Sequence, residues 1–136
     1  MRTPSGEALV SDYNSQHNRA VWFDIPVIDL ERAASFYRAV LGIQMHREQL
    51  QGGAFYVLEH EAGNGGCLVV SPSQVGATGV LVYLNVDGRI RDAVAQAAQR
   101  GGKIVEPIQP IGPHGFRAVA LDCEGNRIAL HSQRDA

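Results

Sequence analysis

The chain has 136 residues, 45% hydrophobic and 19% charged, which is enough to bury the core of one ordinary domain. Its net charge of −2 provides no basic surface for nucleic acid, and no apolar run is long enough to cross a bilayer. The N-terminus lacks the apolar segment of a secretory signal, and Cys67 and Cys123 show no disulfide or metal-binding spacing, so we expect a cytoplasmic protein.

The predicted elements begin after a polar arm, residues 1–18, which has no periodic pattern. Val21–Val27 alternates apolar side chains with mixed ones and predicts a strand. Asp29 is the expected N-cap of a helix over Leu30–Leu41, and Gly42 is its expected end. Short strands should follow near Ile43–Glu48, Ala54–Glu59 and Gly66–Ser71.

The second half of the chain repeats this plan after a connection rich in Ser, Gly and Pro, Pro72–Gly79. It predicts a strand over Val80–Val86, a helix over Arg89–Arg100, and strands near Lys103–Glu106, Phe116–Asp122 and Arg127–Ser132.

Glycines mark the repeat. Leu41-Gly42 matches Arg100-Gly101 at the helix ends, and Gly63-Asn64 matches Gly125-Asn126 before the last strands. We therefore predict an α+β fold of two βαβββ modules, about 19–72 and 79–133, within one domain over 19–136. The modules should form an incomplete eight-stranded barrel-like sheet with the helices outside. Because such sheets leave free edges, we expect a homodimer.

Strand alternation separates a helix-facing apolar set from a mixed set on the opposite face. The mixed set is Trp22, Asp24, Leu81, Tyr83 and Asn85 on the first strands, and Cys67, Ala129 and His131 on the last strands. We expect these side chains to line a shared cavity for a small organic molecule.

Asp24, His131 and Tyr83 are the candidate catalytic residues of this cavity, because a carboxylate, an imidazole and a phenol can transfer or hold protons. Asp24 and His131 would be the proton-transfer pair. Each has a competing structural role, as a paired carboxylate, a strand-end histidine or a tyrosine with a satisfied hydroxyl.

Other predicted contacts come from both modules. Trp22 would either fill space or stack on a flat ligand. For Cys67 we expect foremost the role of a small buried side chain. His114 lies in a Gly- and Pro-rich loop at the expected pocket mouth. His17, His46 and His60 show no ligand spacing and receive no role.

Several motifs resemble the vicinal oxygen chelate superfamily, which includes glyoxalase I, bleomycin-resistance proteins and extradiol dioxygenases. They are Asp29-Leu-Glu-Arg-Ala, Phe36-Tyr37, Leu41-Gly42, Gly101-Gly102-Lys103 and Asp122-Cys-Glu-Gly-Asn-Arg-Ile. The ending Gly125-Asn-Arg-Ile-Ala-Leu-His-Ser resembles a branch related to lactoylglutathione lyase. The resemblance implies the same two-module fold.

Metal enzymes of that superfamily hold their ion through His, Gln and Glu on the first and last strands of each module. The resemblance places those ligands at Trp22, Cys67, Leu81 and Ala129, of which only Cys67 can bind a metal. We therefore expect a metal-independent cavity and no cofactor. Two alternatives stay open: a metal-dependent lyase, isomerase or dioxygenase with a relocated set such as Asp24, His131 and His114, or a non-catalytic interaction subunit.

Overall fold

The computed structural model describes residues 20 and 22–136, so the predicted arm over 1–18 lies outside the described residues. Module 1 contains β1 (Asp24–Val27), α1 (Leu30–Leu41), β2 (Met45–Leu50), β3 (Gly53–Leu58) and β4 (Cys67–Val70). Module 2 contains β5 (Val82–Asn85), α2 (Ile90–Gln99), β6 (Lys103–Pro110), β7 (Phe116–Leu121) and β8 (Arg127–Ser132). Short 3-10 turns lie at Pro72–Gln74 and Gly112–His114.

Each module forms one four-stranded sheet, with strand orders β1-β4-β3-β2 and β5-β8-β7-β6. β1 runs parallel to β4, as β5 does to β8, and the remaining pairs are antiparallel. Asp24 pairs with Cys67 in one sheet and Tyr83 pairs with Ala129 in the other. The shared register confirms the predicted repeat of two βαβββ modules, and neither sheet closes into a barrel.

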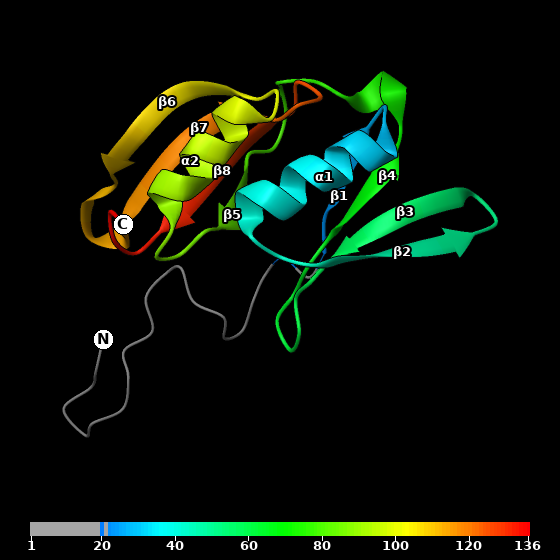
Figure 1. The fold of residues 1–136 in the computed structure, drawn as a ribbon, viewed down its shortest axis with the longest axis horizontal. Coiled ribbons are helices and arrows are strands. Elements are labelled where there is room, and N and C mark those ends of the chain that lie inside the picture. Colours follow the sequence, from blue (N-terminus) through cyan, green and yellow to red (C-terminus); the bar gives the residue numbers. More distant parts are fainter. Residues whose placement is uncertain (1–19, 21) are drawn as a thin grey trace.

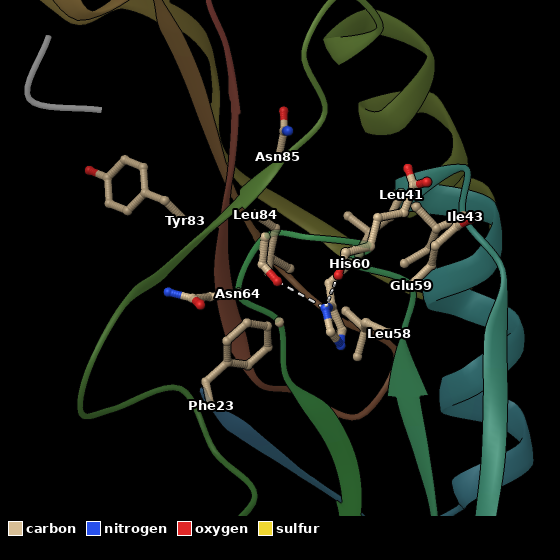
Figure 2. A pocket seen from close by; sticks show the side chains of 13 residues that line it. Phe23, Leu41, Ile43, Leu58, Glu59, His60, Asn64, Tyr83, Leu84 and Asn85 are labelled. Atoms are coloured by element: carbon tan, nitrogen blue, oxygen red, sulfur yellow. Dashed lines mark hydrogen bonds between the residues drawn. The ribbon is translucent and has the colours of Figure 1, made fainter. Parts of the chain in front are cut away.

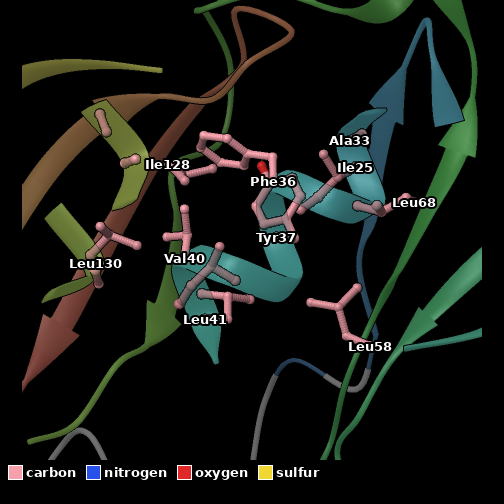
Figure 3. Packing of buried hydrophobic residues seen from close by; sticks show 14 of the residues in the cluster. Ile25, Ala33, Phe36, Tyr37, Val40, Leu41, Leu58, Leu68, Ile128 and Leu130 are labelled. Carbon is pink, nitrogen blue, oxygen red and sulfur yellow. The ribbon is translucent and has the colours of Figure 1, made fainter. Parts of the chain in front are cut away.

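Helix α1 forms where its caps predict it. The Asp29 side chain accepts a hydrogen bond from the Arg32 amide at 3.1 Å, and Gly42 ends the helix with a φ of 67°. Its apolar side packs into a core to which both modules contribute, including Ile128 and Leu130 of β8 (Figure 3). The sheets therefore share one hydrophobic core.

The two helices contact each other and lie on the same side of the molecule (Figure 1). Arg89, at the start of α2, donates from Nη1 to the Val40 carbonyl at 2.6 Å, near the end of α1. None of the helices in residues 22–136 is both long and apolar enough to span a membrane.

The Asp122–Asn126 turn of module 2 fastens the start of module 1. The buried side chain of Glu124 accepts hydrogen bonds from the amides of Ile28, at 2.8 Å, and Asp29, at 3.3 Å. Asn126 donates to the Pro26 carbonyl at 2.7 Å. Through these bonds the Asp-Cys-Glu-Gly-Asn motif of module 2 holds the start of module 1 and fixes the orientation of the two modules.

Some strand boundaries differ from the prediction. β1 is shorter than the alternating segment, and β2 begins two residues later than expected, at Met45. β6 continues to Pro110 although Pro107 interrupts its sequence, because β6 is an edge strand and a missing amide donor there leaves no partner unpaired.

Candidate functional site

A cavity of about 450 Å³ lies where module 1 meets β5 of module 2 (Figure 2). Module 1 contributes Phe23, Leu41, Ile43 and Leu58, together with Glu59, His60, Glu61, Gly63, Asn64 and Gly65 of the β3–β4 loop. Module 2 contributes Tyr83, Leu84 and Asn85. The cavity thus exists only because the two modules are held together.

The floor of the cavity is apolar, and its rim is polar. Leu41, Leu58 and Leu84 are buried side chains of the shared core that also border the cavity. His60 and Asn64 approach it from the loop, as Figure 2 shows. An apolar surface with a few convergent polar groups is typical of small-molecule sites.

The β3–β4 loop folds around the imidazole of His60. His60 Nδ1 lies 2.9 Å from the Gly63 carbonyl oxygen and 3.1 Å from the Glu61 carbonyl oxygen. Both oxygens can only accept, so Nδ1 carries the proton in these bonds. In the neutral ring Nε2 is then unprotonated and presents a lone pair.

Two glycines allow aromatic rings to lie directly on this loop. A Cβ at Gly65 would come within 2.7 Å of the His60 ring, and a Cβ at Gly66 within 2.5 Å of the Phe23 ring. Trp22 approaches His60 edge to face, with ring centroids 5.7 Å apart. The glycines of Gly63-Asn-Gly-Gly66 therefore form the loop and also leave the space that the rings of His60 and Phe23 occupy.

The opposite wall is the face of β5. Tyr83 is 37% exposed, and its hydroxyl accepts a hydrogen bond from Arg117 Nη1. The Arg117 guanidinium also lies 5.8 Å from the Tyr83 ring centroid, and its Nη2 bonds to Glu106 Oε1 at 3.2 Å. Arg117 was not among the predicted site residues, although it pairs with His131 across β7 and β8 on the mixed face.

The charged side chains that line the cavity are acidic. Glu59 and Glu61 belong to the lining, and among the described lining residues there is no Lys or Arg. One oxygen of Glu59 accepts from the Gln44 amide at 3.0 Å. The local charge favours neutral or cationic ligands over anions.

Of the predicted site residues, Tyr83 and Asn85 line this cavity, and Trp22 contacts its His60. Asp24 is exposed and borders a separate hollow of about 150 Å³ at the seam, the contact between module 1 and module 2. It accepts a hydrogen bond from the Cys67 thiol at 3.1 Å. Burial, reinforced by this bond, raises the pKa of Cys67 to about 11, so the thiol stays protonated at neutral pH.

The remaining predicted residues lie away from the cavity lining. His131 is buried, and its Nε2 donates to the His114 carbonyl at 2.7 Å. Ala129 is fully buried and Leu81 is half-buried. Asp24 bonds to the Cys67 thiol and His131 bonds to the His114 carbonyl, so their role as a proton-transfer pair stays a prediction.

The donor set at the superfamily's metal positions does not fit a metal. Trp22, Leu81 and Ala129 offer no ligand atom, and Cys67 is a protonated thiol. The relocated set of Asp24, His131 and His114 does not assemble either. No group of three or more His, Cys, Asp or Glu side chains within the described residues is placed to hold an ion.

Known proteins that are similar to this chain share its two-module fold. A family model for the Glyoxalase/Bleomycin resistance protein/Dioxygenase superfamily matches residues 19–130. Among proteins of curated function, none matches the sequence.

Solved structures of similar fold include a glyoxalase/bleomycin resistance protein/dioxygenase family enzyme from Burkholderia phytofirmans PsJN. It is 18% identical with a TM-score of 0.65, over 82% of this chain and 96% of that one. TnmS3, an antibiotic binding protein from Streptomyces sp. CB03234, is 21% identical with a TM-score of 0.63, over 88% and 98%. The fosfomycin resistance protein FosX from Listeria monocytogenes is 14% identical with a TM-score of 0.63, over 85% and 93%.

Proposed function

This chain belongs to the glyoxalase/bleomycin resistance protein/dioxygenase superfamily, and from that premise we propose that it binds a small organic molecule in the cavity between its modules. The binding uses no metal, because three of the residues at the superfamily's metal positions lack donor atoms and the fourth, Cys67, is a single thiol that stays protonated at neutral pH.

The observation that carries the proposal is the composition of this cavity. Its volume of about 450 Å³ lies within the range of small-molecule sites. Buried leucines form the floor, Phe23 and Tyr83 supply flat aromatic walls, and His60 and Asn64 supply polar groups at the rim. This combination suits a ligand with an apolar body and a small number of hydrogen-bonding groups.

Two structural relatives support the same reading. TnmS3 is described as an antibiotic binding protein and FosX as a fosfomycin resistance protein, so this fold accommodates small organic molecules. Their low identity to this chain means that the fold supports the ligand class, whereas the identity of the ligand depends on this chain's own residues.

A thermal-shift screen of small aromatic compounds tests the proposal. A ligand present at 100 times its Kd should stabilise the protein by about 2.7 kcal/mol. Tyr83→Ala removes one aromatic wall and should weaken binding about tenfold, a loss of about 1.4 kcal/mol. Leu50→Ala is the matched control, because it removes another exposed apolar side chain, 62% exposed, from a strand outside the cavity.

If Tyr83→Ala and Leu50→Ala weakened ligand binding equally, the ligand would lie outside the cavity and the proposal would be contradicted. Compounds that bind Tyr83→Ala as tightly as the wild type would contradict the proposal as well.

A further inference from the structure

We infer that His60 determines which ligands enter the cavity: its Nε2 is a pre-oriented hydrogen-bond acceptor that selects a small apolar molecule bearing a protonated amine. The inference deepens the proposed function and rests on it. It concerns a histidine that sequence spacing gave no role.

The proton position follows from the partners of Nδ1. The Glu61 and Gly63 carbonyl oxygens, at 3.1 and 2.9 Å, both accept from this nitrogen. A histidine bound in this way donates through Nδ1 and accepts through Nε2. His60 is exposed, and without these two acceptors its ring would exchange freely between its two neutral forms.

The ring is held in place by more than these bonds. It lies against the backbone of Gly65, where a Cβ would be only 2.7 Å away, and against the edge of Trp22. Glu61 adopts a φ of 46°, the only positive φ of a non-glycine residue among those described. Backbone strain of this kind persists where the surroundings fix a conformation, and here the strained residue supplies a carbonyl to His60.

The charges beside His60 favour a cation. Glu59 and Glu61 line the same cavity, and the nearby guanidinium of Arg117 is paired with Glu106 and bonded to Tyr83. An ammonium group would donate to Nε2 and lie in the field of the two carboxylates. A carboxylate ligand has no proton for Nε2 and would be repelled by them.

The first test reads the tautomer without any ligand. Long-range ¹H–¹⁵N spectra of the full chain should show His60 protonated at Nδ1 and unprotonated at Nε2 near pH 8. Gly65→Ala should disturb this pattern, because its new Cβ displaces the ring. Gly52→Ala is the control, because its Cβ would meet nothing within 4 Å and Gly52 lies outside the cavity lining. A dominant Nε2-protonated form in the wild type would overturn the inference and leave the proposed function standing.

The second test uses three probes that share a phenyl ring: benzylamine, benzyl alcohol and benzoate. Amide shift changes at Asn64, Gly65 and Leu84 report binding in the cavity. We expect benzylamine to bind about tenfold more tightly than benzoate, with benzyl alcohol between them.

His60→Phe keeps a flat ring on Gly65 but removes the acceptor, so it should bind benzylamine about fivefold more weakly and keep only the part of the preference that Glu59 and Glu61 supply. His46→Phe is the matched control, because His46 is also exposed, bonds to Glu48 at 2.7 Å, and does not line the cavity.

Cavity binding in which benzoate equals benzylamine, or in which His60→Phe keeps the full wild-type preference, would overturn the role of His60 but keep the proposed function. Absence of cavity shifts with all three probes would contradict both.

Discussion

Replacement of Glu124 by Gln should weaken the attachment between the modules, on which the cavity depends. The Glu124 carboxylate accepts from the Ile28 and Asp29 amides and from Arg32 Nε at 3.1 Å. Gln keeps the shape and one acceptor oxygen but loses the charge. Hydrogen bonds to charged groups contribute about 1.5–3 kcal/mol each, whereas the half-exposed Arg32 pair adds about 0–1 kcal/mol. We expect a net loss of about 2 kcal/mol.

Thermal and urea unfolding measure this loss. For a domain of this size, about 2 kcal/mol corresponds to a midpoint lower by roughly 8 °C. Glu48→Gln is the control, because its carboxylate is exposed, and it should change stability by less than about 0.5 kcal/mol.

The pH dependence gives an independent check. Burial alone would raise the pKa of Glu124, but its bonds to Arg32 and to the Ile28 and Asp29 amides outweigh burial and hold the pKa below 4.5. A lowered pKa stabilises the folded state above the ordinary pKa, and this contribution disappears as pH falls through the folded value. The gap between wild type and Glu124→Gln should therefore close below about pH 4.5. An equal gap at pH 7 and pH 3, or no gap at pH 7, would refute this account of the seam.

Three further predictions concern the site and its surroundings. Dialysis against EDTA should leave ligand-induced stabilisation unchanged, and its loss, restored by a divalent metal, would contradict the metal-independent proposal. Burial, with nearby carboxylates, raises the pKa of Cys67 and Cys123 from 9.0 to about 11. Iodoacetamide should therefore label both thiols slowly at pH 8 unless urea is added, and fast labelling of the folded protein would disprove the burial argument. The free energy of unfolding should fall between pH 9 and 11, because the thiols of the unfolded chain lose their protons at lower pH than those of the folded chain. Gly66→Ala should cost about 1–3 kcal/mol by calorimetry, because its Cβ meets the ring and the carbonyl of Phe23, whereas Gly63→Ala should cost clearly less.

Much of the fold was predictable because local signals coincide with the global arrangement. Asp29 and Gly42 fix both ends of α1, and the prediction matches Leu30–Leu41 at each end. The strand β8, Arg127–Ser132, was also predicted with the correct bounds. The predicted strand ended at Glu106, before Pro107, because proline usually ends a strand. β6 continues to Pro110 because it lies at the edge of its sheet, and that position depends on tertiary packing.

The site was only partly predictable. Strand alternation identified Tyr83 and Asn85, because side-chain parity on a strand is a local property. It also placed Asp24 and His131 on the mixed faces, but which side chains share a cavity depends on how the sheets pack. His60 was missed since its role arises from loop closure onto two carbonyls. The glycines around Asn64 were the one available signal, and Gly63-Asn64 was interpreted only as a mark of the internal repeat.

Binding between the two modules is tested most directly by a map of backbone amide shifts as the best compound from the screen saturates the protein. We expect the largest changes on both sides of the cavity, at Asn64 and Gly65 in module 1 and at Leu84 and Asn85 in module 2. Changes centred instead on Asp24 and the hollow beside it would contradict the claim that the ligand lies between the β3–β4 loop and β5.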